Sequence, residues 1–289
     1  MVITRRKTNY SNGRQSKRSE QSVVEVSHAP AADHEDMSSD PDFMTSLARG
    51  LCVLQAFARH KRSVTASQLS SQTGFSRAAV RRCLYTLTRL GFTGCDDSGH
   101  NFLLPKVMTL GYAYFSSMPF VRSAQPVLDR LASVLGESCS LAVLQGHEIV
   151  YVVRAPVTRV MTVDLQVGSR LPAFCTSMGR VLLANLPDDE CEMHLSQLKI
   201  HQYTSRTVAT VDKLRRILRV VQRNGFSITD QELEVGLRSI AVPVRNPIGK
   251  IVAGLNAATH VARFSCAELH SRFLSHLLKS AADLSMLAS

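Results

Sequence analysis

The spacing of hydrophobic residues between positions 43 and 92 predicts three successive helices. A first helix has one apolar face, formed by residues at i, i+4, i+7 and i+11: Leu47, Leu51, Leu54 and Ala58. A short second helix is expected at residues 66–72, with Thr65 as its N-cap and Gly74 at its end. A third helix follows the capping residue Ser76, and its buried stripe consists of Val80, Cys83, Leu84, Leu87 and Leu90.

The third helix carries a group of arginines outside its apolar stripe. They are Arg77, Arg81, Arg82 and Arg89, and Tyr85 shares their solvent side. Two short helices joined by a tight turn, the second positively charged, are typical of a helix-turn-helix that enters the DNA major groove. Strand patterns at residues 92–95 and 101–104, with the turn sequence DDSG between them, add a β-hairpin wing. We therefore expect a winged-helix domain at residues 43–104.

A linker helix is predicted at residues 105–119, beginning at Pro105. Its apolar residues cover more of the helix surface than one stripe needs, so a second copy of the chain could cover the excess. Beyond the linker, helical patterns at residues 124–135, 178–185, 212–224 and 266–287 alternate with strand patterns.

The strand patterns of the C-terminal part predict two β-hairpins. One joins residues 138–144 to 149–154, the other joins residues 239–245 to 250–258, and residues 159–165 predict a further strand. Because hairpins build antiparallel sheets, residues 120–289 are expected to form an α+β domain with helices packed on the sheet.

The charge along the chain points to the winged helix as a DNA-binding segment. The whole chain has 34 Lys and Arg against 23 Asp and Glu, a net charge of +11. Residues 1–42 have no apolar period and are nearly neutral, so we expect a disordered tail. Residues 43–104 hold eight basic and two acidic residues, a net charge of +6. Such a segment is the footprint of a nucleic-acid-binding protein, although a solvated basic face would give the same count.

Composition also excludes several classes of protein. Apolar residues make up 45% of the chain, which indicates globular domains, but no apolar run reaches the roughly 18–20 residues of a membrane helix. The basic N-terminus is not followed by an apolar stretch, so no secretory signal is expected. The seven cysteines form no C-x-x-C pair, which favours reduced thiols in a cytoplasmic protein.

The sequence contains no clear catalytic or metal-binding motif. The ten histidines show neither H-E-x-x-H nor Cys/His zinc spacing, and G-x-G-x-x-G and P-loop sequences are absent. The segment CTSMG is similar to the nucleophile elbow of hydrolases, but Cys175 replaces its first glycine and no histidine pairs with that cysteine in sequence. We expect no enzyme activity, cofactor or metal, and a hydrolase is the competing hypothesis.

Three motifs together resemble the IclR family of bacterial transcriptional regulators. They are TGFSRAAVRRCLYTL at residues 73–87, RLPAFCTSMGRVLLA at 170–184 and DQELEVGLRSIAVPVRNPIGKIVA at 230–253. The resemblance covers residues 43–289 and is strongest to the subgroup that controls aromatic-acid breakdown through protocatechuate and β-ketoadipate. It implies a winged helix that binds operator DNA, a GAF-like domain that binds a small acid, and a homodimer or homotetramer.

The predicted DNA-binding residues are Thr65, Ser76, Arg77, Arg81 and Arg82. Ser76 begins a helix whose free N–H groups can hold a phosphate. Arg77 and Arg81 are one turn apart, and an arginine can bind guanine O6 and N7 in a bidentate manner. Contact with phosphate or water alone is the alternative for these arginines. One winged helix reads half a site, so a dimer on a near-palindromic operator is implied.

The predicted effector site centres on the turn before the helix at residues 178–185. Thr176 and Ser177 place hydroxyls at a positive helix end, which suits a carboxylate, although an ordinary N-cap without a ligand has the same sequence. Phe174 and Met178 could supply an apolar wall for an aromatic ring. The resemblance implies further binding positions at Thr229, Leu237, Ser239, Asn256 and Ala258, and Asp230 is included because it adjoins Thr229.

An anionic effector also needs a cation. The candidates are Arg154, Arg159, Arg170 and Arg238, and a surface ion pair is the alternative for Arg238. Asn256 and Ala258 replace small hydroxyl residues of glyoxylate-type relatives, which argues against that ligand. The expected effector is instead protocatechuate, 4-hydroxybenzoate or β-ketoadipate. The protein itself is expected to be a transcriptional activator that this acid controls. RNA polymerase is a further candidate partner, and a C-terminal domain that only oligomerises is the remaining alternative.

Overall fold

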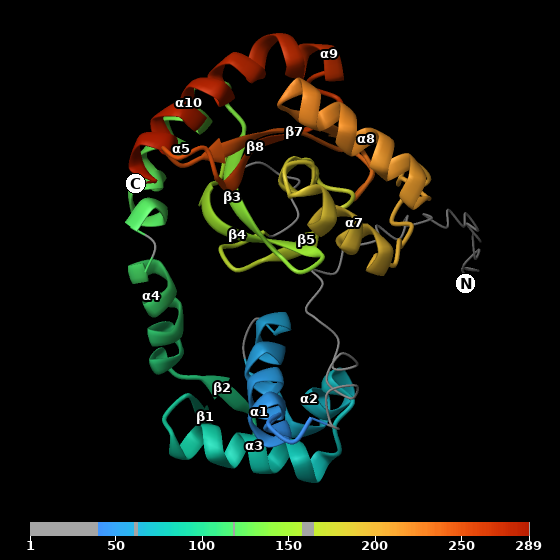
Figure 1. Cartoon of the computed structure of the whole chain (residues 1–289). Helices are drawn as coiled ribbons and strands as arrows, with labels where there is room; N and C mark the ends of the chain where they lie inside the picture. Colours follow the sequence, from blue (N-terminus) through green and yellow to red (C-terminus); the bar gives the residue numbers. More distant parts are fainter. Residues whose placement is uncertain (1–39, 61–62, 118, 158–164, 289) are drawn as a thin grey trace, which may run out of the picture.

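The computed structural model of the chain describes residues 40–60, 63–117, 119–157 and 165–288. Figure 1 shows a small N-terminal lobe and a larger C-terminal lobe, with the helix α4 (Met108–Ser117) running between them along one side. Most of the predicted tail and of the predicted strand at residues 159–165 lies outside the described residues. Within the described part of the chain, no helix is long and apolar enough to cross a membrane.

The small lobe is a helical unit with a two-stranded wing. Its elements are α1 (Thr45–Ala56), η2 (Phe57–Arg59), α2 (Ala66–Thr73), α3 (Arg77–Arg89), β1 (Thr93–Cys95) and β2 (Asn101–Leu103). Thr65 caps α2 in a reciprocal capping box with Gln68, and the Ser76 hydroxyl accepts from the backbone N–H of Ala79 at 3.2 Å. Gly74 ends α2 with a φ of 74°, a conformation that glycine adopts without steric cost.

The face of α1 that packs into this lobe is not the predicted one. Val53, Ala56 and Phe57 are the residues buried against α2 and α3, whereas Leu47 and Leu51 are 56% and 48% exposed. Since α1 is apolar on both sides, the spacing of its leucines could not decide which side meets the core of a single chain. The predicted stripe of α3 is buried at Val80, Leu84 and Leu87, but Leu90 lies past the last helical residue and is 52% exposed.

The large lobe is built on a six-stranded antiparallel sheet with the strand order β5-β4-β3-β8-β7-β6. The strands are β3 (Ser138–Gln145), β4 (Glu148–Ala155), β5 (Arg170–Pro172), β6 (Ser227–Asp230), β7 (Leu237–Arg245) and β8 (Ile251–His260). Both predicted hairpins are present, as β3–β4 and β7–β8. The sequence analysis missed β5 and β6, because three or four residues are too few for an alternating pattern to be recognised.

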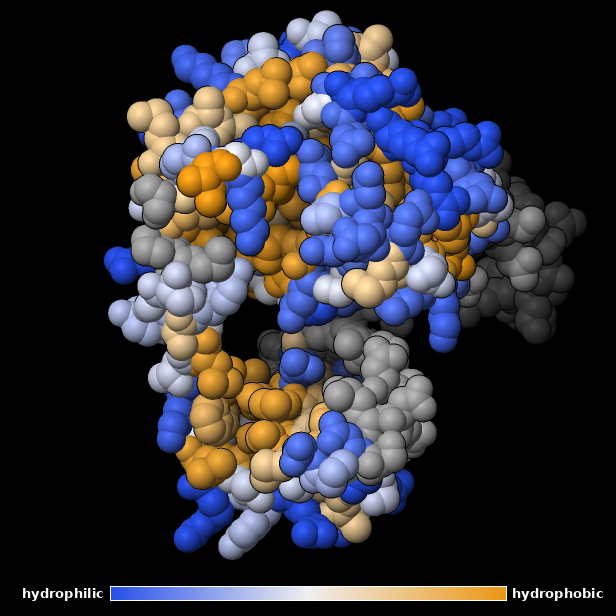
Figure 2. Space-filling model, in the orientation of Figure 1, coloured by the Kyte–Doolittle hydropathy of each residue, from blue (hydrophilic) through white to orange (hydrophobic). Residues whose placement is uncertain are grey.

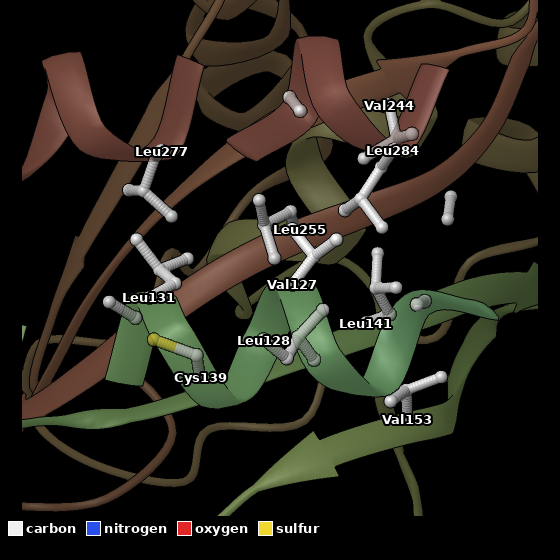
Figure 3. Packing of buried hydrophobic residues seen from close by; sticks show 14 of the residues in the cluster. Val127, Leu128, Leu131, Cys139, Leu141, Val153, Val244, Leu255, Leu277 and Leu284 are labelled. Carbon is white, nitrogen blue, oxygen red and sulfur yellow. The ribbon is translucent and has the colours of Figure 1, made fainter. Parts of the chain in front are cut away.

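Helices cover both faces of this sheet. One face packs against α5 (Pro119–Leu135) and α10 (Leu274–Leu287), and Figure 3 shows Leu128 and Leu131 of α5 with Leu277 and Leu284 of α10 in that core. The other face packs against α6 (Ser177–Leu183) and α8 (Val211–Asn224). A further helix, α7 (Asp188–Gln197), was not predicted, and only Leu195 of its residues is buried. The short helix α6 therefore lies directly over the centre of the sheet.

Candidate functional site

The first candidate site is the exposed side of α3. Arg77, Arg81, Arg82 and Arg89 are all exposed, and Tyr85 is 69% exposed beside them. Helix α3 lies at the end of the small lobe that is farthest from the sheet (Figure 1). Within the described residues, no carboxylate forms a salt bridge with Arg77, Arg81 or Arg82. The helix thus presents unneutralised guanidinium groups on a surface long enough to lie in a DNA groove.

Thr65 and Ser76, the two hydroxyl residues predicted at this surface, are used for helix capping. The Thr65 hydroxyl accepts from the backbone N–H of Gln68 at 3.2 Å, and Ser76 makes the corresponding contact with Ala79. Each cap satisfies a free N–H group of the first turn, so Thr65 and Ser76 fix where α2 and α3 begin.

The second candidate site lies on the sheet face beneath α6, where four strands align small side chains. One row in register across β3, β8, β7 and β6 consists of Ser138, Ala258, Ser239 and Thr229. The next row on the same face consists of Ser140, Asn256, Ala241 and Ser227, and Arg154 of β4 stands opposite Ser140. Residues that are opposite each other on neighbouring strands, or two apart on one strand, share a face of the sheet.

Three hydroxyls from three different elements meet on this face. The Oγ atom of Ser239 lies 2.8 Å from Ser177 Oγ and 2.9 Å from Thr229 Oγ1. We refer to Ser177, Thr229 and Ser239 as the hydroxyl cluster; all three are buried. In the adjacent row, Asn256 is 5% exposed, and its Oδ1 atom has no hydrogen-bond partner among the described residues. An unsatisfied buried polar atom costs roughly 1–3 kcal/mol, which a bound hydrogen-bond donor would recover.

Close packing of α6 on the sheet gives this site an apolar side. A Cβ atom added to Gly254 of β8 would lie 3.1 Å from the Met178 Cβ, so the helix lies so close to the strand that a larger residue would have to push it away by a few tenths of an ångström. Met178 itself is 1% exposed. Thr176 is the N-cap of α6: its hydroxyl accepts from the Gly179 N–H at 3.3 Å and donates to the Pro172 carbonyl at 3.0 Å. That hydroxyl is therefore engaged in the local fold.

Comparison with known proteins identifies the family of both lobes. The model of the IclR helix-turn-helix domain matches residues 46–96, and the model of the bacterial transcriptional regulator IclR C-terminal domain matches residues 112–286. The Pca regulon regulatory protein of Pseudomonas putida is 49% identical over 257 residues, which are 89% of this chain and 88% of that protein. The chain belongs to the IclR family of bacterial transcriptional regulators.

Solved structures of transcriptional regulators share the fold. A Rhodococcus sp. RHA1 protein described as a transcriptional regulator is 43% identical, with a TM-score of 0.74 over 85% of this chain and 98% of that one. The inducer-binding domain of a PobR double mutant from Acinetobacter, solved as a complex with 3-hydroxybenzoic acid, is 29% identical. Its TM-score is 0.55, over 57% of this chain and 97% of that one.

The IclR fold separates two of the predicted effector residues from the hydroxyl cluster. Asp230 follows Thr229 on β6, and Arg238 precedes Ser239 on β7. Because neighbouring residues of a strand face opposite ways, both point to the opposite face of the sheet. There the Arg238 guanidinium pairs with the Asp230 carboxylate at 2.7 Å, and Arg206 approaches the other oxygen at 2.6 Å. Asp230 and Arg238 therefore lie on the sheet face opposite the hydroxyl cluster.

The other predicted cations have different surroundings. Arg170 is engaged by Glu148 at 2.7 Å and by Gln145 at 2.7 Å, at the edge of the sheet. Arg159 lies outside the described residues. Arg154 shares the row of Ser140 and Asn256, on the face that carries the hydroxyl cluster. Of the described candidates, Arg154 is thus the one on the same sheet face as the cluster.

The remaining predicted residues line the same half of the lobe. Leu237 lies two residues before Ser239, and it packs into the core beneath α6. Phe174 is 2% exposed, and its ring centroid lies 6.3 Å from that of Tyr203.

Burial raises the pKa of the Cys175 thiol to about 12, although Arg180 opposes that shift. A thiol held in its protonated form is a poor nucleophile, which argues against the hydrolase hypothesis.

One buried ion pair near this site could not be recognised from the sequence. Arg180 of α6 is 2% exposed, and its guanidinium binds both carboxylate oxygens of Glu232, at 2.7 and 2.6 Å. The two residues are 52 positions apart, and each lies in a motif that the sequence analysis treated as a separate feature. Only the packing of α6 beside the end of β6 brings them together.

Proposed function

We propose that this IclR-family protein activates genes for aromatic-acid breakdown, and that a small aromatic or related carboxylic acid controls its binding to operator DNA. Protocatechuate, 4-hydroxybenzoate and β-ketoadipate are the candidate effectors. The hydroxyl cluster carries this proposal. It is a buried group of hydroxyls beside the apolar side chain of Met178 and beside the Asn256 Oδ1 atom, which no described residue hydrogen-bonds. This combination suits a ring with polar substituents.

The names of the relatives support the same class of effector. The Pseudomonas putida relative is a regulator of a Pca regulon, and the Acinetobacter domain binds 3-hydroxybenzoic acid. In the proposed mode, Ser177, Thr229 and Ser239 bind the ring substituents and Arg154 neutralises the carboxylate. Phe174, Thr176 and Leu237 shape the site indirectly, by packing and by capping α6.

On DNA, the proposed reader is the arginine side of α3. Arg77, Arg81 and Arg82 enter the major groove, and at least one of them binds a guanine edge. The protein acts in the cytoplasm as a homodimer or homotetramer, so that two α3 helices read the two halves of one operator. Activation brings RNA polymerase to the promoter as a further partner.

Isothermal titration calorimetry on the full-length protein tests the effector. We expect saturable binding of protocatechuate, 4-hydroxybenzoate or β-ketoadipate, and no binding of 4-hydroxybenzyl alcohol, which lacks the carboxylate. Binding of none of the three acids would refute the proposal and leave a C-terminal domain that only oligomerises.

A gel-shift titration at fixed salt tests the DNA-binding surface. Arg81→Ala removes one guanidinium from the exposed side of α3, and a good bidentate base contact is worth about 1–3 kcal/mol. We expect operator affinity to fall by a factor of roughly 5–150, with acid binding unchanged. Arg223→Ala on α8, an exposed arginine of the other lobe, is the matched control. Equal operator affinity of Arg81→Ala and the unmutated protein would contradict the assignment.

A further inference from the structure

The ion pair of Arg180 and Glu232 connects the two halves of the proposed effector site. Arg180 lies three residues after Ser177 on α6, and Glu232 lies three residues after Thr229 at the end of β6. Ser177 and Thr229 are the two partners of Ser239 in the hydroxyl cluster. The ion pair therefore spans the same two elements as the cluster does, one helical turn away from it.

Arg180 also binds the backbone of the turn that leads into α6. Its Nε atom donates to the Phe174 carbonyl at 2.9 Å, so the guanidinium is bound on two sides, by that carbonyl and by the Glu232 carboxylate. A Cβ atom added to Gly179 would lie 2.1 Å from the Ala173 carbonyl oxygen, which shows how closely the turn lies against α6. The position of the turn at residues 173–176 is thus fixed from within the helix that it precedes.

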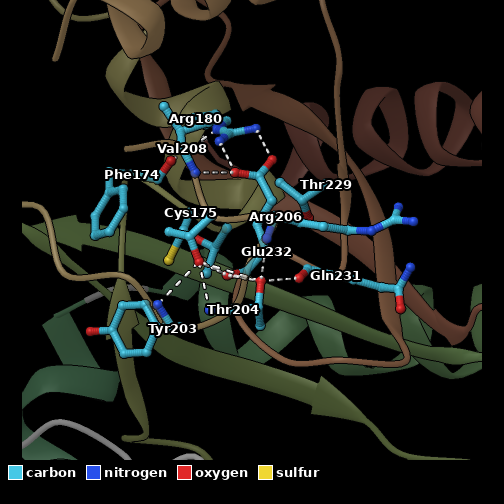
Figure 4. Close-up of polar contacts among 12 residues, drawn as sticks. Phe174, Cys175, Arg180, Tyr203, Thr204, Arg206, Val208, Thr229, Gln231 and Glu232 are labelled. Atoms are coloured by element: carbon cyan, nitrogen blue, oxygen red, sulfur yellow. Dashed lines mark hydrogen bonds and ion pairs between the residues drawn. The ribbon is translucent and has the colours of Figure 1, made fainter. Parts of the chain in front are cut away.

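A third segment, the loop at residues 203–208, is bound to the same pair. The Glu232 carboxylate accepts from the Val208 N–H at 3.3 Å, and the hydroxyl of Thr207 donates to the Glu232 carbonyl at 2.6 Å. Thr204 donates to the carbonyl of Gln231 at 2.7 Å. Figure 4 shows the contacts of Arg180, Val208 and Thr204 with residues 231 and 232.

Gln231 has an unusual backbone conformation. Its φ is 60°, and it is the one non-glycine residue with a positive φ in the described part of the chain. Such a conformation is uncommon for a residue with a side chain and persists where surrounding contacts determine it. The contacts of Thr204, Thr207 and Arg180 supply that constraint, directly next to the strand that carries Thr229.

A buried ion pair of this kind is weak evidence for a role in stability alone. Taking two charges out of water is costly, and replacing such a pair with apolar residues of similar volume is often neutral or stabilising. The geometry that it imposes is more specific, because a guanidinium and a carboxylate meet in one planar arrangement.

We propose that Arg180 and Glu232 are a positioning pair for effector recognition. The pair does not touch the acid. It holds three segments in place: the turn at residues 173–176, the loop at 203–208 and the end of β6. This arrangement lets Ser177 and Thr229 meet at Ser239. The inference rests on the proposed function, since it assigns the hydroxyl cluster to acid binding.

Substitution of the pair, with calorimetry and thermal unfolding of the full-length protein, tests this inference. The double variant Arg180→Met/Glu232→Met keeps the volume and removes both charges. We expect a folded protein with a lower melting temperature, because the Phe174 carbonyl and the Val208 N–H lose their partners. Its affinity for protocatechuate or 4-hydroxybenzoate should be at least tenfold lower. Arg180→Lys keeps the charge without the planar fork, and we expect it to weaken acid binding as well. An unchanged dissociation constant in both variants would overturn the proposal.

A matched control exists on the surface of the same lobe. Arg215 of α8 binds both oxygens of Glu192 of α7, at 2.8 and 2.9 Å, in a similar bidentate arrangement that is solvent-exposed. Arg215→Met/Glu192→Met should leave acid binding unchanged. If the double variant at 180 and 232 does not fold, Arg180→Lys decides the outcome.

A second measurement separates failure of this inference from failure of the proposed function. If the unmutated protein binds none of the acids, the proposed effector is wrong. Hydrogen exchange without any acid then tests the pair, because Arg180→Lys should accelerate exchange at the amides of Val208, Tyr203 and Thr204. Unchanged exchange at these amides would show that the pair does not hold the loop.

Discussion

At the scale of single residues, the proposed effector site depends on one hydroxyl. Ser239 alone contacts both other members of the hydroxyl cluster, and it is 7% exposed. Its neighbours along β7 face the opposite side, so the alternation of the strand determines which of these polar residues can share a ligand. Asp230 and Arg238 show the consequence, since they adjoin cluster residues in sequence and pair with each other on the far face.

The substitution Ser239→Ala tests this arrangement. Loss of the hydroxyl leaves Ser177 and Thr229 without their shared partner, which should lower the free energy of unfolding by about 1–3 kcal/mol. We also expect weaker acid binding by calorimetry. Thr259→Val is the matched control, because Thr259 is 4% exposed and its hydroxyl has no hydrogen-bond partner among the described residues. Acid affinity equal to that of the unmutated protein would remove Ser239 from the site.

At the scale of elements, α1 and α4 present apolar surfaces that the single chain does not cover. Met44, Leu47 and Leu51 are between 48% and 65% exposed on the α1 side. On α4, the exposed residues are Met108 at 75%, Leu110 at 51% and Tyr112 at 69%. Figure 2 shows hydrophobic surface over α4 and the adjoining part of the small lobe. Contiguous exposed apolar surface of this kind marks an interaction site, and a second copy of the chain is the proposed occupant.

Charge placed on this surface should separate the proposed dimer. We expect Leu47→Lys/Leu110→Lys to shift the protein from dimer to monomer in analytical ultracentrifugation, because two lysines would have to be buried in the interface. Operator affinity should fall with it, since a monomer reads one half-site. Val235→Lys is the control, as Val235 is 74% exposed on the other lobe. A double variant that sediments like the unmutated protein would place the interface elsewhere.

At the scale of the whole molecule, a histidine pair links the β3–β4 turn to α7. The Nδ1 atoms of His147 and His194 lie 3.1 Å apart, and the rings are nearly perpendicular. The backbone carbonyl of His147 also accepts from the Ala173 N–H at 2.9 Å, at the start of the turn that leads to α6. Burial and then the neighbouring His147 lower the pKa of His194 below its ordinary value of 6.5, against a smaller opposite effect of Glu190.

Protonation of His194 should destabilise the fold in mild acid. Because the pKa of His194 is lower in the folded state, the unfolded chain binds more protons between the folded value and 6.5. The contribution of His194 to stability is therefore complete above pH 6.5 and is lost as the pH falls through that window. Urea unfolding at pH 7.5 and 5.5 should show a smaller loss for His194→Gln than for the unmutated protein. An equal loss in both would contradict the role of the pair.

The sequence by itself determined the elements that depend on neighbours in the chain. Caps at Thr65 and Ser76, the end of α2 at Gly74 and both hairpins follow from local chemistry, so they could be predicted. The tertiary structure decided which surfaces meet: Val53 rather than Leu47 enters the core, and Asp230 and Arg238 turn away from the hydroxyl cluster. It also joined Arg180 to Glu232 across 52 positions. The physical reason is that periodicity fixes the direction of a side chain relative to its own element, whereas packing fixes what that side chain meets.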